Sequence, residues 1–400
     1  MIDVACRTEP SSLEFKVPTH KRPIPEGSNG VKNGSSGARG QAEEAAVPGT
    51  LFSMGTSHPE ATSRHIMAAG GLLSLEWEFG RSYWTFDGDG DIQTFDVCKI
   101  VGKGFGVVAR RHLATGTRLM AEVPLARLKS VTWASRAAAE VELDAVLAKL
   151  SQPAREDFFR LSQSGKHGST QNAMGTWLTN ALPINYDDPS SPNADEAAVF
   201  ATISRLNHSC SPSCHQEWNA ALGMETVHVL RPVVPGEELT ICYLSPAGRP
   251  RAERMAILQE KFGFECDCAV CLLSGESRRR SDAAQQALGR GLLSGDDDQE
   301  LLGGGGASST SAAAVDEKLR LLSQEGLPAV WGRPLVLAAA MQSSAGGQHE
   351  LAVGWLERAL KIVRDACGED SPGFTAVEQL KSAVEEMAQL HAQLGAFRRC

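Results

Sequence analysis

The sequence lacks any long apolar run, and this absence argues against a membrane-spanning helix. No stretch approaches the roughly 18 apolar residues that a helix needs to cross a bilayer. The opening residues, MIDVACRTEPSSLEFKV, also lack the apolar core and the small-residue cleavage pattern of a secretion signal. We therefore expect no membrane association and a reducing compartment.

An excess of positive charge is also missing. The 48 acidic and 39 basic side chains give a formal net charge of −9. Nonspecific binding to nucleic acid needs a basic surface that meets the phosphates, so we expect no direct nucleic-acid partner. The negative charge is compatible with weak attraction to a basic protein segment.

The ten cysteines are not spaced like a disulfide framework. Three of them lie in FGFECDCAVC, at Cys266, Cys268 and Cys271, and two more lie in RLNHSCSPSC, at Cys210 and Cys214. Clustered cysteines in a reducing compartment are more often metal ligands than disulfides. The alternative is a set of buried free thiols, which are common in protein cores.

The C-x-C-x2-C spacing at 266–271 predicts a single structural zinc ion. A short loop can turn three thiolates toward one cation, but structural zinc takes four ligands. The fourth must come from elsewhere in the chain. Cys210 is the first candidate because it lies beside an Asn-His pair, and Cys214 is the second.

Composition divides the chain into an ordered centre with less regular flanks. Residues 1–60 are rich in Gly, Ser, Pro and Glu, which predicts a disordered tail. Residues 61–93 are ambiguous, with one short apolar segment. From residue 94, β-forming segments alternate with turns. Residues 134–163 change to a helical period, with an apolar face formed by Leu143, Val146, Leu147 and Leu150.

The second half predicts further helices. ADEAAVFATISRL at 194–206 is expected to form a short buried helix, and RAERMAILQEKFGF at 251–264 a longer one. The Gly- and Ser-rich stretch 291–312 predicts a flexible linker. Residues 313–400 contain amphipathic helices that fit either a tetratricopeptide-like repeat or a plain helical bundle, and that could offer a surface to a protein partner.

Three further motifs gain meaning from their order. GKGFG at 102–106 has neither the spacing of a dinucleotide fingerprint nor the Lys-Ser/Thr of a phosphate-binding loop, so alone it indicates only a tight turn. Asn207 and His208 could be a satisfied polar pair in a loop, and Tyr243 could be an ordinary core residue. The succession of glycine turn, Asn-His-x-Cys, strand ending in Tyr and cysteine cluster favours a functional site.

This succession resembles the SET-domain protein-lysine methyltransferases, and within them the SET-and-MYND-like proteins. The matching segments are GKGFG, TNALPI, RLNHSCSPSC, GEELTICY and FGFECDCAVC. They cover about residues 95–273. The resemblance implies an α+β fold of the β-clip type, in which small curved sheets with a pseudoknot carry a helical insert. The SET domain would span 94–273, with a post-SET zinc cluster at 262–273 and a C-terminal helical region beyond it.

The resemblance also implies S-adenosyl-L-methionine as the cofactor and a lysine-containing protein, histone or nonhistone, as the substrate, in the nucleus or the cytoplasm. Tyr243 would orient the attacking amine, and Cys210 would complete one zinc site with Cys266, Cys268 and Cys271. The cofactor would contact Lys103, Gly104, Phe105, Asn180, Asn207, His208, Tyr243 and Phe264.

The sequence departs from the family pattern in three ways, and the first two leave a catalytically weak binding or scaffold protein as the alternative. Phe262 stands where a second channel tyrosine is common, which removes one hydrogen-bond partner for the amine. Ser213 replaces an asparagine whose amide would stabilise the loop. No MYND-type zinc finger is visible in the sequence.

Overall fold

The computed structural model describes residues 67–68, 71–72, 94–129, 135–184, 196–244, 248–292 and 311–397. The chain divides into two units, one formed by residues 5–76 and the other by the remainder. In the first unit the strands β1 (Met67–Ala68) and β2 (Gly71–Leu72) pair antiparallel. The predicted tail at 1–60 and most of the predicted linker at 291–312 lie outside the described residues.

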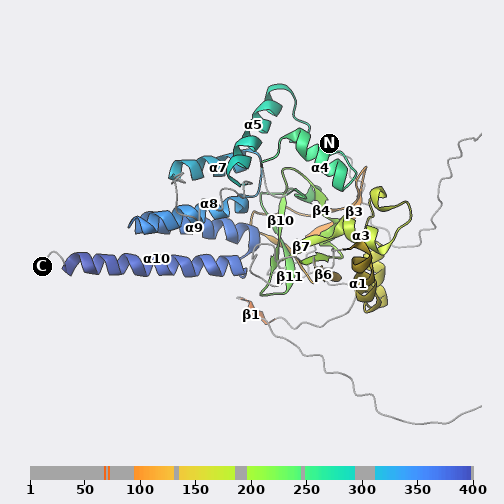
Figure 1. Ribbon diagram of the computed structural model, residues 1–400, viewed down its shortest axis with the longest axis horizontal. Coiled ribbons are helices and arrows are strands. Elements are labelled where there is room, and N and C mark those ends of the chain that lie inside the picture. Colours follow the sequence, from red (N-terminus) through yellow and green to blue (C-terminus); the bar gives the residue numbers. More distant parts are fainter. Residues whose placement is uncertain are drawn as a thin grey trace, which may run out of the picture. The chain divides into compact units, whose positions relative to one another are not determined.

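The larger unit contains three small sheets among its described residues (Figure 1), which confirms the predicted α+β class. Their strand orders are β3-β4-β12-β9, β10-β11-β5 and β6-β8-β7. The strands are β3 (Phe95–Ile100), β4 (Gly104–Ala109), β5 (Arg118–Glu122), β6 (Ala126–Lys129), β7 (Leu182–Ile184), β8 (Glu196–Val199), β9 (Asn207–His208), β10 (Cys214–Asn219), β11 (Met224–Val229) and β12 (Glu238–Ile241).

Strand β9 brings the Asn-His pair next to the end of β12. It runs parallel to β12, with Asn207 opposite Thr240 and His208 opposite Ile241. All other strand pairings among the described residues of the larger unit are antiparallel. A common apolar core that includes Val107, Leu239 and Ile241 fixes these strands. Because β12 is paired on both sides, its register is fixed, and Tyr243, which follows β12, lies beside His208.

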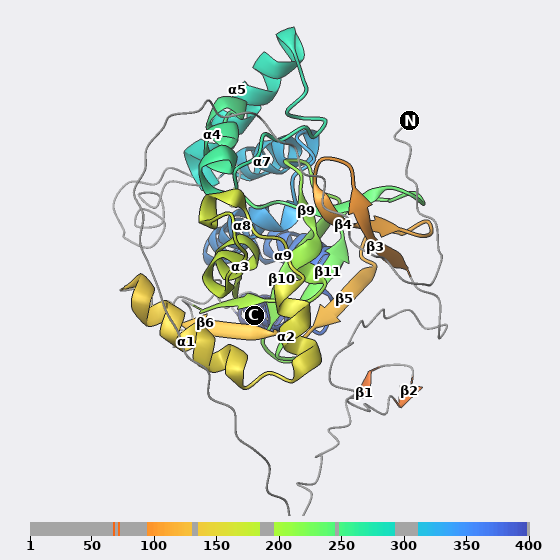
Figure 2. The same ribbon diagram turned by 90° about the vertical axis from the view of Figure 1, so that its right-hand side faces the viewer.

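The helical insert packs against the sheet β6-β8-β7. It comprises α1 (Arg136–Ala148), α2 (Gln152–Phe159) and α3 (Ala173–Asn180), and Figure 2 shows α1 lying along β6. Ser135 and Ser151 accept hydrogen bonds from the first turns of α1 and α2, which caps both helices. The helical break comes before Pro153, which lies in the first turn of α2, where no N–H is needed.

The short helix predicted at 194–206 is wrong. This segment forms β8 and then a single 3-10 turn, η3 (Ile203–Arg205). Strand β8 pairs with β6 on one side and β7 on the other, and these ladders override the helical period of its apolar residues. The apolar residues are nevertheless buried, as the pattern predicted: Phe200, Ile203 and Leu206 are all at most 1% exposed.

The remaining helices follow β12. The predicted helix at 251–264 is observed as α4 (Arg251–Lys261), followed by α5 (Gly275–Leu292), α7 (Ala312–Gln324), the 3-10 turn η4 (Ala329–Gly332), α8 (Arg333–Ala345), α9 (His349–Cys367) and α10 (Pro372–Phe397). Helices α8, α9 and α10 pack in succession, and α9 also contacts β10 and β11. Among the described helices, none has the length and apolar character that a bilayer crossing requires.

Candidate functional site

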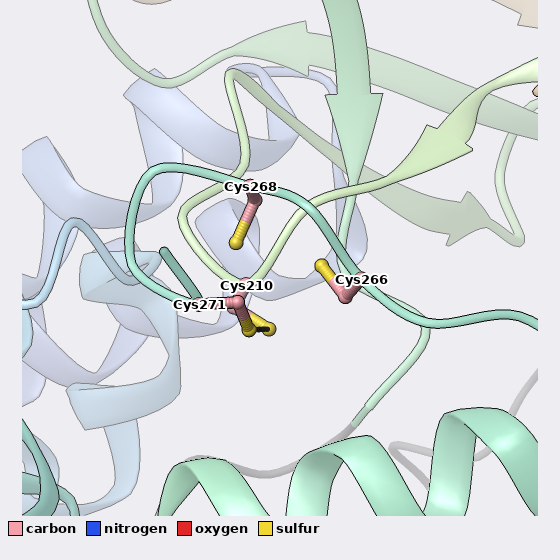
Figure 3. A group of neighbouring side chains, drawn as sticks. All are labelled: Cys210, Cys266, Cys268 and Cys271. Carbon is pink, nitrogen blue, oxygen red and sulfur yellow. Dashed lines mark hydrogen bonds between the residues drawn. The ribbon is translucent and has the colours of Figure 1, made fainter. Parts of the chain in front are cut away.

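Four cysteines from two distant segments converge next to the Asn-His strand (Figure 3). Cys210 comes from the loop after β9, and the other three come from the loop after α4. The four sulfur atoms lie within 4.8 Å of one another, and the Sγ atoms of Cys210 and Cys271 are 3.5 Å apart. Cys214, the second candidate for the fourth ligand, instead lies in the apolar core between the sheets. The donor set is one that fits a tetrahedral zinc ion.

Hydrogen bonding among the four thiols favours thiolates at two of them. Hydrogen bonds with Cys210 lower the pKa of Cys268 and bring that of Cys271 to about 7, whereas the pKa values of Cys210 and Cys266 are raised. The guanidinium of Arg254 is 5% exposed and places Nη2 3.9 Å from Cys271 Sγ, while its Nε has no hydrogen-bond partner within the described residues. A buried cation needs a counter-charge, and anionic sulfur supplies it here.

His208 connects the cysteine cluster to the strand that carries Tyr243. Its Nδ1 accepts a hydrogen bond from Tyr243 N at 2.9 Å, and its Nε2 lies 3.3 Å from Cys210 Sγ. Burial lowers the pKa of the imidazole to about 4, so the ring is neutral near pH 7. With Nδ1 accepting, the proton belongs on Nε2 and points at the sulfur. His208 thereby fixes the position of Tyr243 relative to the cluster.

A cavity of about 220 Å³ lies beside this link. Gly102 opens its backbone to the cavity: its φ of +78° favours glycine, and no atom lies within 4 Å of where a Cβ would stand. The cavity is lined by Val101, Gly102, Lys103, Asn207, His208, Tyr243, Phe264, Glu265, Cys266 and Asp267.

Glu238 holds one wall of the cavity together. Its carboxylate accepts hydrogen bonds from Asn207 Nδ2 at 2.8 Å and from Lys103 Nζ at 3.1 Å. Lys103 also lies 3.4 Å from Asp267. Asn207 can approach this closely because residue 106 is glycine: a Cβ there would stand 2.7 Å from Asn207 Nδ2. Glu238 was not among the predicted site residues, although its place in the GEE segment at the start of β12 was a usable signal.

Aromatic rings pack around Tyr243. Its ring centroid lies 5.0 Å from that of Phe262 and 6.4 Å from that of Phe264. The hydroxyl donates to the carbonyl oxygen of Leu206 at 2.7 Å, and burial raises its pKa above the ordinary value. The phenol therefore stays protonated near pH 7 and has a fixed direction.

Three predicted cofactor contacts are not among the residues lining the cavity. Gly104 and Phe105 belong to β4, next to the glycine turn, and Phe105 is 48% exposed beneath the guanidinium of Arg205. Asn180 is buried on α3, where its Nδ2 donates to the carbonyls of Ser162 and Thr176. Two acidic residues that were not predicted also line the cavity: Glu265 and Asp267, which flank the first clustered cysteine.

Ser213 has a clear structural role despite its departure from the family pattern. Its Oγ accepts a hydrogen bond from Thr240 N at 2.9 Å, and its own N–H donates to Thr240 Oγ1 at 3.3 Å. This reciprocal pair fastens the loop after Cys210 to β12. A hydroxyl thus supplies the loop attachment that the sequence pattern assigned to an amide.

Comparison with known proteins identifies the module that contains these residues. The model of the SET domain matches residues 104–244, which run from β4 to the end of the Tyr243 segment. The chain contains a SET domain. The match includes Asn207, His208, Cys210 and Tyr243, whereas the cysteines at 266–271 lie beyond its end.

Relatives of this SET domain are named as lysine methyltransferases. The chain is 32% identical over 200 residues to the histone-lysine N-methyltransferase set5 of Schizosaccharomyces pombe, an alignment covering 50% of this chain and 57% of the relative. It is 40% identical over 73 residues to the human histone-lysine N-methyltransferase SMYD3, covering 18% and 16%. It is 42% identical over 76 residues to the histone-lysine N-methyltransferase ATXR4 of Arabidopsis thaliana, covering 18% and 22%. The chain therefore spans about half, or less, of these relatives.

Proposed function

We propose that this chain is an S-adenosylmethionine-dependent methyltransferase that acts on lysine side chains of proteins. The observation that carries the proposal is one cavity where Asn207, His208 and Tyr243 meet inside a SET domain. The named activities of the relatives support the same reaction. They favour it over the alternative of a catalytically weak scaffold protein.

The lining residues suit a ligand with an amino acid at one end and an adenine ring at the other. The open backbone at Gly102 and the amide of Asn207 offer hydrogen-bonding groups, and Phe264 offers an aromatic face. Lys103 would face the same ligand. Gly104, Phe105 and Asn180 stay proposed contacts at the rim of the glycine turn and at α3. When bound, the cofactor supplies an electrophilic methyl group.

Tyr243 would orient the attacking amine of the substrate lysine. Only about one free lysine in 2,500 is neutral at pH 7, given a pKa of ~10.4. The aromatic surroundings formed by Tyr243, Phe262 and Phe264 disfavour the ammonium form, because a desolvated charge is costly. Alignment of a neutral amine against a fixed phenol can then account for much of the rate acceleration.

The cysteine cluster would bind one zinc ion as a structural element. Cys210, Cys266, Cys268 and Cys271 would be its four ligands, and a closed site of this kind does no chemistry. The ion would tie the loop after α4, which carries Phe264, to the loop after β9. Since His208 joins Cys210 to Tyr243, the metal would also hold the catalytic phenol in place.

The substrate is proposed as a histone or another lysine-containing protein in the nucleus or the cytoplasm. The acidic residues Glu265 and Asp267 at the cavity suit a basic segment. Phe262 leaves the amine one hydroxyl fewer than a second tyrosine would provide. This difference bears on how many methyl groups the site can add, and Phe262→Tyr is the variant that reports it.

The test uses the full chain, labelled cofactor and a panel of histones and cell extract. Thermal-shift titration with S-adenosylmethionine establishes binding first, with Asn207→Ala as the variant expected to weaken it. Label on lysine in any protein of the panel supports the proposal. Binding without label on lysine would leave the scaffold alternative, and the absence of binding would exclude both.

A further inference from the structure

A second group of metal-binding side chains lies where the SET domain meets the C-terminal helices. His215 and Glu217 are on β10, and Cys367 is the last residue of α9. Their ligand atoms lie within 4.8 Å of one another. We refer to these three residues as the junction cluster. The junction cluster shares no residue with the four cysteines beside the cavity.

The side chains of His215 and Cys367 converge on a single carboxylate oxygen of Glu217. Glu217 Oε2 lies 3.4 Å from His215 Nε2 and 2.9 Å from Cys367 Sγ. The other oxygen, Oε1, faces Arg333 Nη1 at 3.7 Å. The two carboxylate oxygens therefore have different partners. One faces a partly exposed cation, and the other faces two groups that can bind a metal.

The geometry suits a tetrahedral ion. Zinc bonds of about 2.0–2.3 Å place neighbouring ligand atoms roughly 3.3–3.7 Å apart. The His215–Glu217 separation of 3.4 Å falls in that range, the Cys367–Glu217 separation of 2.9 Å is shorter, and all three ligand atoms lie within 4.8 Å of one another. Imidazole, carboxylate and thiolate are all zinc ligands, and the two anions would balance a divalent charge. A thiol is only a weak hydrogen-bond donor, so a hydrogen bond alone gives little reason for so short a contact between Cys367 and Glu217.

The surroundings are buried and contain a further imidazole. His215 is 6% exposed and Cys367 is fully buried. His228 lies directly opposite His215 in the β10–β11 ladder and is 2% exposed. Its Nε2 accepts a hydrogen bond from Arg118 at 3.1 Å, whereas its Nδ1 has no partner among the residues that the structure describes.

We propose that the junction cluster is a second zinc site, which fastens the C-terminal end of α9 to the sheet of the SET domain. His215, Glu217 and Cys367 are its three ligands, and the fourth position is left to water or to His228. Binding converts the Cys367 thiol to a thiolate and releases its proton to solvent. The ion restrains two regions that are otherwise joined by packing and by ion pairs such as Arg118–Asp370.

Native mass spectrometry of the full chain, produced with Zn²⁺ in the medium, tests this proposal without any measurement of methyl transfer. The wild type is expected to carry two zinc ions. Cys367→Ser and Cys266→Ser should each carry one, and the double variant none. Cys214→Ala is the matched control, because Cys214 adjoins His215 on β10 but lies in the apolar core, and it should keep two.

Glu217→Gln keeps the shape of the side chain and guards against a folding defect in Cys367→Ser. It should also lose one zinc ion while the chain retains its circular dichroism spectrum. One ion in the wild type that is lost in Cys266→Ser and kept in both junction variants would overturn the proposal and leave a hydrogen-bonded network. The ion at the four cysteines is counted separately, so either site can fail alone.

Discussion

The SET domain and the C-terminal helices each have an apolar core, but they differ in the contacts that join their segments. In the SET domain, specific polar contacts such as Glu238 with Asn207 and His208 with Cys210 join short strands and loops in addition to the core. The C-terminal helices bury a continuous apolar core that includes Leu322, Val336 and Leu356. Specific polar contacts depend on individual residue types, whereas apolar packing depends on volume and pattern. Substitutions should therefore act differently in the two regions.

The largest difference should follow from removal of one cysteine ligand. Cys266→Ser is expected to abolish zinc binding at the four-cysteine site. The loss of the ion should destabilise the SET domain, because structural zinc provides folding free energy directly. The melting temperature of the SET domain should fall by at least about 5 °C, while the helical core is retained. Native mass spectrometry and circular dichroism measure both effects. Cys98→Ser on β3 is the control, and equal losses in the two variants would contradict the assignment.

Tyr243→Phe should separate turnover from binding. Removal of the hydroxyl is expected to lower kcat by about 10²-fold, because it misaligns the reacting groups, and to leave cofactor affinity unchanged within about twofold. Phe264→Ala should instead weaken cofactor binding. Single-turnover kinetics and calorimetric titration distinguish the two. Full turnover in Tyr243→Phe would remove that residue from the catalytic role.

A buried carboxylate should give the SET domain a pH dependence of its own. Burial raises the pKa of Glu122 to about 7, while backbone N–H groups of Ile203 and Thr202 oppose the rise. Between about pH 4.5 and 7 the folded state binds the proton that the unfolded state has lost. Stability therefore falls as pH rises through this window, by up to about 3 kcal/mol.

Glu122→Gln should remove that fall, as denaturant unfolding between pH 5 and pH 8 would show. Glu385→Gln, on the exposed side of α10, reports the general effect of removing one negative charge. If the two variants follow the same pH profile, the dependence has another origin.

The smallest effects should come from Gly→Ala substitutions, one in the SET domain and one in the C-terminal helices. Gly106→Ala places a Cβ 2.7 Å from Asn207 Nδ2 and should weaken cofactor binding by about tenfold. Gly354→Ala meets nothing within 4 Å on an exposed face of α9 and should stabilise the protein by about 0.5–1 kcal/mol. Calorimetric titration and thermal unfolding measure these changes. We expect a loss of cofactor affinity in Gly106→Ala and a gain of stability in Gly354→Ala. A loss in both variants would weaken the contrast between the two regions.

Much of the candidate site could be predicted because its residues lie in short motifs. The spacing of Cys266, Cys268 and Cys271 predicted a metal cluster, and the need for a fourth ligand made Cys210 the first candidate. The helix predicted at 194–206 failed because strand pairing on both sides of β8 outweighed its local period. Glu238 was missed because its two partners lie 31 and 135 residues away in the chain.

The sequence by itself determined which local motifs are present: the cysteine cluster, the Asn-His pair, the strand ending in Tyr243 and the apolar periods of most helices. Local spacing and burial preference act over a few residues, so these features can be predicted from the sequence alone. The tertiary structure alone decided which groups meet, including His208 between Tyr243 and Cys210, and Cys367 beside Glu217 across 150 residues. Such contacts depend on strand register and helix packing, which arise only when distant segments bury a common core.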